Sequence, residues 1–228
     1  MPDDNEVRGA IVAVCRRLYE RGLIAGPDGN VSARLARDRI VVTPAGMSKI
    51  DVAVDDLVDV SLTGIHVGGV RRATSELAVH LRIYARRPDI RAVVHAHPPT
   101  ATAFAVAGET VPAGVLPELL LQMGTVALVP YAMPGTVELA DAFEPFIATH
   151  DAFVMANHGA VTVGASLLDA HQRMESLEHA ARIVFAARLL GTVNELSPEA
   201  VSALVAARER AGPPAIGRES ERRQGRGA

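Results

Sequence analysis

Two histidines one residue apart, with a third farther along the chain, are the residues whose types and spacing point most directly to chemistry. His95 and His97 flank an alanine, and His158 lies in the later run Ala-Asn-His-Gly. Side chains of a β-strand repeat every second residue, so His95 and His97 would leave one face and could bind the same ion. Three protein nitrogens leave a fourth position open on a zinc-like ion, as in catalytic metal sites. Two core histidines and one loop histidine would give the same pattern, so other residues must decide.

Glu76 is the candidate base. Thr74 and Ser75 fit as caps of a helix predicted over Glu76 to Ala85, which leads directly into the histidine strand. A cation bound nearby would keep the carboxylate of Glu76 charged and positioned to move a proton. The alternative interpretation is a glutamate that only interacts with the dipole of its helix.

Three short segments around these residues could hold an anion such as phosphate. They are Gly29 to Ser32, Thr43 to Gly46, and Thr74 to Glu76. Glycines allow a ligand to approach the main chain, and the free N–H groups at a helix start provide positive potential. Each segment alone is also ordinary turn chemistry, so their joint presence carries the prediction.

Hydrophobic periodicity and turn residues predict the elements that must position these groups. Short strands are expected in the first third of the chain, with a hairpin between Leu35 and Ile40, and the longest helix is expected near the C-terminus. The predicted helices cover residues 4–20, 76–85, 98–107, 136–147, 167–190 and 196–211, and the predicted strands cover 31–35, 39–43, 57–60, 92–97, 125–129, 152–156 and 161–163.

The composition limits the classes of protein that the chain can belong to. With 228 residues and 49% hydrophobic content, we expect a single domain over residues 1–212 and a mobile C-terminal tail over 213–228. The net charge of -3 gives no basic footprint for nucleic acid. The start of the sequence is acidic rather than signal-like, and no apolar span is long enough for a bilayer, so we expect a cytoplasmic protein without a membrane partner. The single cysteine, Cys15, is expected to fill an apolar helix face.

Six ordered motifs resemble the class II aldolase and adducin family, with the nearest likeness to L-fuculose-phosphate aldolases. The resemblance spans roughly residues 5 to 195. The motifs are Gly29-Asn30-Val31-Ser32, Thr43-Pro44-x-Gly46, Ser75-Glu76, His95-x-His97-Pro98, Pro130-Tyr131-Ala132-x-Pro134-Gly135-Thr136 and His158-Gly159. Six motifs in the family's order are far more specific than any one of them.

The resemblance implies both a fold and a set of roles. It implies an α/β fold, a three-layer αβα sandwich around a central mixed and largely antiparallel sheet, assembled as a cyclic homotetramer. His95, His97 and His158 would bind Zn2+, with Co2+, Mn2+ or Fe2+ as alternatives, and Glu76 would shuttle protons and occasionally act as a further ligand. The residues that would hold the substrate phosphate are Gly29, Asn30, Ala45, Gly46, Thr74 and Ser75.

The chemistry of the residues agrees with a metal-dependent lyase. Cleavage of a carbon–carbon bond beside a carbonyl leaves an enediolate, whose charge must be accepted by a lysine imine or a metal ion. Lys49 is the only lysine, whereas three suitable metal ligands are present, so we expect a metal. The predicted activity is an aldehyde-lyase of carbohydrate metabolism, a class II aldolase that reversibly cleaves a small ketose, with a ketose 1-phosphate of the fuculose-phosphate type as the expected substrate.

Departures from the family pattern keep alternatives open. Leu116 stands where fuculose enzymes place a tyrosine acid from a neighbouring subunit, and Tyr131, Glu118 or water could replace it. Asp28 and Ala45 stand where hydroxyl residues often support the phosphate, and the charge of Asp28 opposes a dianion. Relatives on the same metal scaffold act as decarboxylases, epimerases or dehydratases. A non-catalytic adducin-like interaction module is a further alternative, although that branch lacks the full ligand set.

The remaining candidates receive structural interpretations. His80, His171 and His179 lie on predicted helices without a spaced partner ligand, so we assign them to surface or interface packing. Lys49 is expected to be an exposed lysine near a turn, where it could contact an acid or a phosphate.

Overall fold

The computed structural model describes residues 3–35 and 38–211, and its centre is an eight-stranded sheet with the order β4-β3-β2-β1-β5-β8-β7-β6. Every neighbouring pair of strands is antiparallel except β6 and β7. The sheet is therefore mixed and largely antiparallel, as expected. The strands are β1 (Asn30–Arg34), β2 (Arg39–Val42), β3 (Val58–Ser61), β4 (His66–Gly68), β5 (Ala92–Ala96), β6 (Val126–Val129), β7 (Ala152–Met155) and β8 (Gly159–Gly164).

The helices follow the predicted periodicity closely. The first helix buries Val7, Ile11, Val14 and Leu18 along one face, and Cys15 is buried beside them as expected. None of the helices in the described ranges combines the length and apolar composition that a bilayer-spanning segment needs. The helices are α1 (Asp4–Glu20), α2 (Leu77–Arg86), α3 (Pro99–Val106), α4 (Pro117–Met123), α5 (Val137–Ile147), α6 (Leu167–Leu190) and α7 (Pro198–Ala211).

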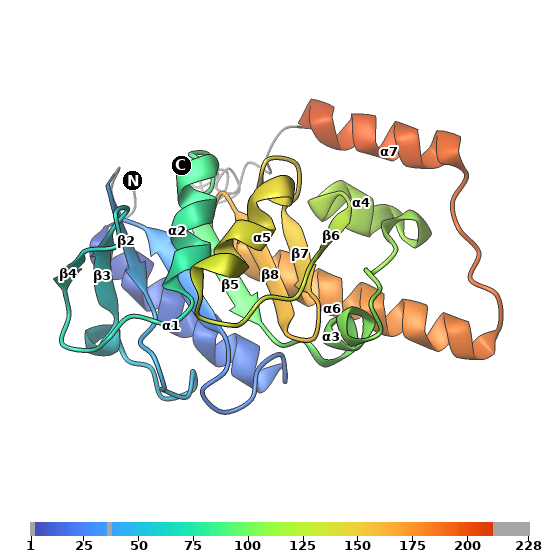
Figure 1. Ribbon diagram of the computed structural model, residues 1–228. Coiled ribbons are helices and arrows are strands. Elements are labelled where there is room, and N and C mark those ends of the chain that lie inside the picture. The colour runs from blue at the N-terminus through green and yellow to red at the C-terminus, as the bar shows by residue number, and fades with distance from the viewer. Residues whose placement is uncertain (1–2, 36–37, 212–228) are drawn as a thin grey trace, which may run out of the picture.

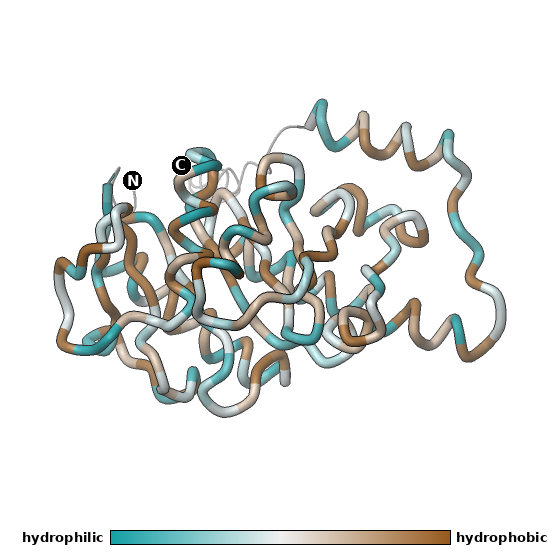
Figure 2. Tube along the Cα trace, in the orientation of Figure 1, coloured by the Kyte–Doolittle hydropathy of each residue, from teal (hydrophilic) through white to brown (hydrophobic). Residues whose placement is uncertain are grey.

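The sheet separates two apolar cores, which makes the fold a three-layer αβα sandwich. One core joins the sheet to α1, α3, α4 and α6, and the other joins it to α2 and α5. In Figure 1, α2 and α5 lie in front of the sheet and α1 and α6 behind it. Apolar residues concentrate in the strands between these layers (Figure 2). This architecture confirms the predicted α/β class.

Alternation along β5 decides which layer holds the histidine site. Val94 and Ala96 belong to the core under α6, whereas Val93 belongs to the core under α2. Side chains alternate across a strand, so His95 lies on the α2 side of the sheet. Asn30 of β1 is the residue paired with His95 in the antiparallel register, so the two side chains leave the same face.

Some local predictions were wrong or incomplete. Helix α2 begins at Leu77, and its N-cap residue is Glu76 rather than Thr74 or Ser75. The sequence also gave no indication of α4 or β4, because a helix of seven residues is too short to show a period and the edge strand β4 buries none of its residues. The tail expected over residues 213–228 lies outside the described residues.

Candidate metal centre

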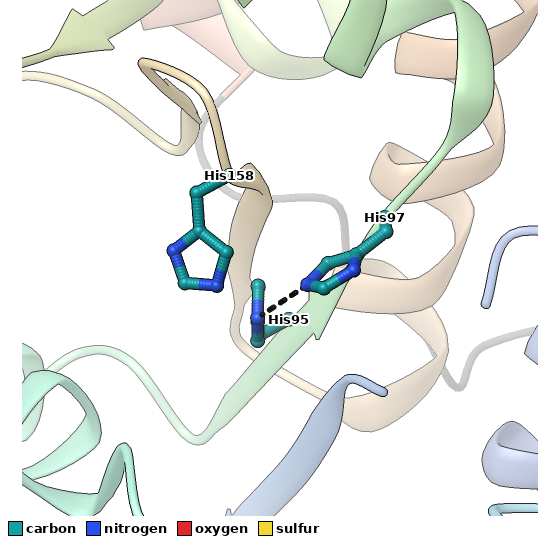
Figure 3. A group of neighbouring side chains, drawn as sticks. All are labelled: His95, His97 and His158. Atoms are coloured by element: carbon teal, nitrogen blue, oxygen red, sulfur yellow. Dashed lines mark hydrogen bonds between the residues drawn. The ribbon is translucent and has the colours of Figure 1, made fainter. Parts of the chain in front are cut away.

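Three imidazole rings from distant parts of the chain converge on one point (Figure 3). The ring centroids of His95, His97 and His158 lie 4.9 to 5.2 Å apart in every pair. One nitrogen from each ring lies within 4.8 Å of the others, and Nε2 of His95 is 3.3 Å from Nε2 of His97. Three convergent imidazole nitrogens are the donor set of catalytic zinc sites.

The turn between β7 and β8 brings His158 to His95 of β5 and to His97, which follows the end of that strand. Asn157 adopts a left-handed conformation with φ of 57°, and the amide of His158 donates to the carbonyl of Met155. The following residue, Gly159, packs directly against the site. A Cβ at this position would lie 2.6 Å from the carbonyl oxygen of Ala96 and 2.6 Å from Cδ2 of His97. Only glycine fits here, which explains the His-Gly pair in the sequence.

Polar contacts on the far side of the rings orient two of the histidines. Nδ1 of His95 donates to the carbonyl of Ala160 over 2.9 Å, so Nε2 is the nitrogen of this ring that faces the site and could bind a metal. Nδ1 of His97 lies 3.4 Å from Oδ2 of Asp28, again on the edge opposite to Nε2. Burial, reinforced by the charge of His95, lowers the pKa of His97 to about 4, so its imidazole is neutral near pH 7. A neutral imidazole is the form that binds a metal.

Glu76 places its carboxylate among the three rings. Its Oε2 lies 2.9 Å from Nε2 of His95 and its Oε1 lies 3.2 Å from Nε2 of His158. Burial raises the pKa of Glu76, but the charge of His95 and the contacts with His158, His95 and Asn30 outweigh it, so that the pKa is well below its usual range. The buried Oε1 accepts no hydrogen bond from the residues that the structure describes. An orphaned carboxylate oxygen beside three imidazoles fits a divalent cation.

The structure places all the predicted substrate-binding residues around one cavity next to the rings. The cavity has a volume of about 170 Å³. The amides of Gly46 and Ser75 have no acceptor among the described residues, whereas the amide of Ala45 already donates to the carbonyl of Arg72. The cavity is lined by Pro27, Asp28, Gly29, Asn30, Pro44, Ala45, Gly46, Lys49, Thr74, Ser75, Glu76, His95, His97 and His158.

Lys49 is the residue that the sequence reasoning most underestimated. It was expected to be exposed, but it is buried and lines the cavity. Its Nζ donates to the carbonyls of Pro27 and Met47, each over 2.8 Å, and so joins two of the loops that form the cavity. Burial lowers the pKa of the Lys49 ammonium. That this is the only lysine was visible in the sequence, but its burial was not.

The candidates for the missing acid are not brought to this site. Glu118 lines a separate cavity of about 500 Å³ beside α6, together with Leu116. Tyr131 is 62% exposed and does not line the cavity at the rings. No titratable side chain of α4 therefore faces the described site.

The assignment of the other histidines to surface or interface packing was wrong in part. His179 is exposed, but His80 and His171 are buried. His80 also hydrogen-bonds with Asn30, a residue of the site.

Comparison with known proteins agrees with the fold and the site. The model of the class II aldolase and adducin N-terminal domain matches residues 9–185. The chain is 34% identical over 179 residues to 3-oxo-tetronate 4-phosphate decarboxylase of Haemophilus influenzae, covering 77% of this chain and 85% of that protein. It is 35% identical over 172 residues to L-fuculose phosphate aldolase of Methanococcus maripaludis, covering 75% of this chain and 92% of that protein.

A solved structure of L-fuculose 1-phosphate aldolase superposes with a TM-score of 0.84 at 29% identity, covering 92% of this chain and 98% of that one. The fold and the site thus define an α/β protein with the three-histidine centre of a metal-dependent enzyme. The chain belongs to the class II aldolase and adducin family.

Proposed function

We propose that the chain is a metal-dependent lyase that reversibly cleaves a small phosphorylated ketose by a retro-aldol reaction. The observation that carries this proposal is the convergence of three imidazole nitrogens and the orphaned Oε1 of Glu76 beside a small polar cavity. The volume of that cavity, about 170 Å³, equals that of roughly five or six water molecules, so the reacting part of the substrate is small.

His95, His97 and His158 would hold the divalent cation, for which Zn2+ is the first candidate and Co2+, Mn2+ and Fe2+ are alternatives. When bound, such a cation supplies a Lewis acid that stabilises negative charge developing on substrate oxygens. A lysine imine is a poor alternative, because Lys49 is buried and its Nζ is committed to two carbonyls.

Glu76 is the group that we propose to move the proton at carbon. The carboxylate is held in its charged form, and Asn30 donates to its Oε2 over 2.9 Å. Its Oε1 remains free of hydrogen bonds within the described ranges, so it can accept the carbon-bound proton in the condensation direction and return it to carbon in the cleavage direction.

A phosphate group would bind in the cavity next to the rings, against the loop residues that line it. The amides of Gly46 and Ser75 offer unused donors there, and Thr74 and Ser75, whose hydroxyls could also donate, line the same cavity. Lys49 adds a cation to the lining of the cavity, which would attract an anion. Asp28 opposes this attraction with one negative charge.

A second candidate function is decarboxylation of a phosphorylated keto acid. Retro-aldol cleavage requires removal of the proton from the substrate hydroxyl that becomes the aldehyde oxygen, whereas a carboxylate loses carbon dioxide without such a proton transfer. By the family resemblance, Leu116 stands where a neighbouring subunit would supply the tyrosine acid, and leucine cannot transfer a proton. The similarity to a 3-oxo-tetronate 4-phosphate decarboxylase points in the same direction. Epimerisation and dehydration on the same scaffold remain lesser alternatives.

The homotetramer and the cytoplasmic location are also proposals. Supporting the assembly, several large apolar side chains at the end of α6 are exposed, namely Ile183, Phe185, Leu189 and Leu190. Light scattering on the purified protein would give four chains per particle, and a monomer would contradict this part of the proposal.

One product assay separates the two reactions. The zinc-loaded protein is incubated with ketose 1-phosphates including L-fuculose 1-phosphate, with phosphorylated 3-oxo acids, and with the unphosphorylated counterparts of both. Trapped aldehyde would support the aldolase, and released carbon dioxide would support the decarboxylase. Neither product from any phosphorylated substrate would contradict the proposed function.

A further inference from the structure

Five polar side chains form a continuous hydrogen-bonded chain between helix α2 and strand β1. Helix α2 and its N-cap contribute Glu76, His80 and Tyr84, which lie four residues apart and so share one helix face. Strand β1 contributes Asn30 and Ser32, which alternate onto one face of the sheet. The spacings of the two elements match, so the polar groups meet in sequence.

The hydrogen bonds of this chain can run in only one direction. The carboxylate of Glu76 only accepts, so Asn30 presents its NH2 group to Oε2 at 2.9 Å. The amide oxygen of Asn30 then faces His80 and requires a proton on Nε2 of that ring. Nδ1 of His80 must accept from the hydroxyl of Ser32 at 2.6 Å, and the hydroxyl of Tyr84 donates to Ser32 at 2.9 Å.

Burial keeps the hydrogen-bonded side chains in the protonation states that this direction requires. His80 is 1%, Ser32 0% and Tyr84 2% exposed. Burial, with the nearby charge of His95, lowers the pKa of His80 to about 3. A neutral imidazole can donate and accept at once, as the chain requires, whereas an imidazolium would donate at both nitrogens and could not accept from Ser32.

The polar chain crosses a layer that is otherwise apolar. The same face between α2 and the sheet is filled by Val79, Ile83, Val93 and Val161. Burying polar side chains there is costly unless each one is hydrogen-bonded, and apolar residues would fill the space at no such cost. Packing alone therefore does not account for His80, Ser32 and Tyr84.

We propose that Tyr84, Ser32 and His80 are positioning residues that act through Asn30 to orient the carboxylate of Glu76. They fix the amide of Asn30 with its NH2 group toward Oε2. The other oxygen, Oε1, is left without a hydrogen bond from any described residue and lies 3.2 Å from Nε2 of His158. A reversed amide would present its oxygen to the carboxylate and repel it. The inference rests on the proposed role of Glu76 in proton transfer.

The tautomer of His80 tests the direction of these hydrogen bonds without any assay of activity. In 15N spectra of histidine-labelled protein, with the His80 signals assigned by their loss in His80→Gln, the proton is expected on Nε2 at neutral pH. Ser32→Ala removes the donor to Nδ1 but not the contact with Asn30, so the proton is expected to stay on Nε2 while the Nδ1 signal shifts as its hydrogen bond is lost. A wild-type His80 that carries its proton on Nδ1, or that is charged at pH 7, would overturn the inference.

Steady-state kinetics test whether the hydrogen-bonded chain of side chains affects turnover. His80→Leu is expected to lower kcat about 10- to 100-fold, with KM and bound metal nearly unchanged, because the support of Glu76 is lost. His80→Gln should recover most of this loss, since its amide can donate to Asn30 and accept from Ser32. Tyr84→Phe should have a smaller effect, because Ser32 can still donate to His80, and Tyr19→Phe on the exposed face of α1 is the matched control.

Two results would contradict the proposed positioning role. One is a folded, metal-loaded His80→Leu variant with wild-type kcat, and the other is a His80→Gln variant that is no better than His80→Leu. If His80→Leu does not fold, the kcat of Ser32→Ala and the tautomer of His80 still test the positioning role. Failure of the proposed function would give a different result. Full activity in Glu76→Gln would show that Glu76 is not the base, whatever the tautomer of His80.

Discussion

Oδ2 of Asp28 lies 3.4 Å from Nδ1 of His97, on the ring edge opposite to the nitrogen that faces His95. Carboxylates in this position hold a ligating histidine in the right tautomer and raise its affinity for metal. The same Asp28 lines the cavity in which we place the substrate phosphate. One side chain thus supports the proposed metal and opposes the proposed anion.

Asp28→Ser should therefore separate metal binding from substrate binding. We expect weaker metal retention, by about tenfold or less because the side chain is partly exposed, and a lower KM for a phosphorylated substrate. Competition with a chelator measures the first effect and steady-state kinetics at saturating metal measure the second. A variant with unchanged metal affinity would show that Asp28 does not support His97.

Gly159→Ala should disrupt the metal centre without touching a ligand. The added methyl group would lie 2.6 Å from Cδ2 of His97 and 2.6 Å from a backbone oxygen, so the ring or the turn must move. We expect loss of most bound metal, measured by elemental analysis of protein that remains folded by circular dichroism. Gly9→Ala is the matched control, because a Cβ there has no neighbour within 4 Å and Gly9 lies in helix α1. Equal metal content in both variants would contradict the described packing.

Lys49→Met should weaken phosphate binding more than metal binding. The change removes a buried cation that lines the cavity and the two hydrogen bonds that join its loops. We expect KM for a phosphorylated substrate to rise by about tenfold or more, equivalent to about 1.4 kcal/mol. The comparison is with the unphosphorylated analogue, for which KM should change much less. A parallel rise for both substrates would indicate that Lys49 only shapes the loops.

The stability of the protein should fall in acid partly through His80. Burial and the charge of His95 lower the pKa of His80 from 6.5 to about 3, so below pH 6.5 the unfolded chain binds a proton that the folded chain excludes. The stability contributed by this group is present above pH 6.5 and is lost as pH falls toward 3, at up to about 1.4 kcal/mol per pH unit. Urea unfolding of the metal-free protein at pH 7 and pH 5 measures the difference.

His80→Gln should flatten this pH dependence, because glutamine does not titrate. His179→Gln is the control, since His179 is exposed on α6. The same slope in wild type and His80→Gln would mean that His80 is protonated in the folded state.

The sequence predicted most of the fold because the periodicity is strong. Helices α1 and α6 begin and end at the predicted residues, and the hairpin of β1 and β2 forms as expected. The separation into two cores could not be predicted residue by residue, because it depends on the order in which the strands pair.

The candidate site was predictable where the residues form motifs and not where tertiary packing decides. The structure brings His95, His97, His158 and Glu76 together as expected, although their roles remain predictions. The burial of Lys49 was missed, because a single lysine near a turn is usually exposed. The hydrogen bonds of His80 were missed too, since its partners Asn30 and Ser32 are 48 to 50 residues away.

The most direct test of the proposed metal chemistry is to measure bound metal and turnover together in wild type, His97→Ala and Glu76→Gln. We predict about one divalent metal per wild-type chain, loss of both metal and turnover in His97→Ala, and retention of metal without turnover in Glu76→Gln. An active wild-type preparation that contains no metal, or a His97→Ala variant that keeps full turnover, would contradict the account.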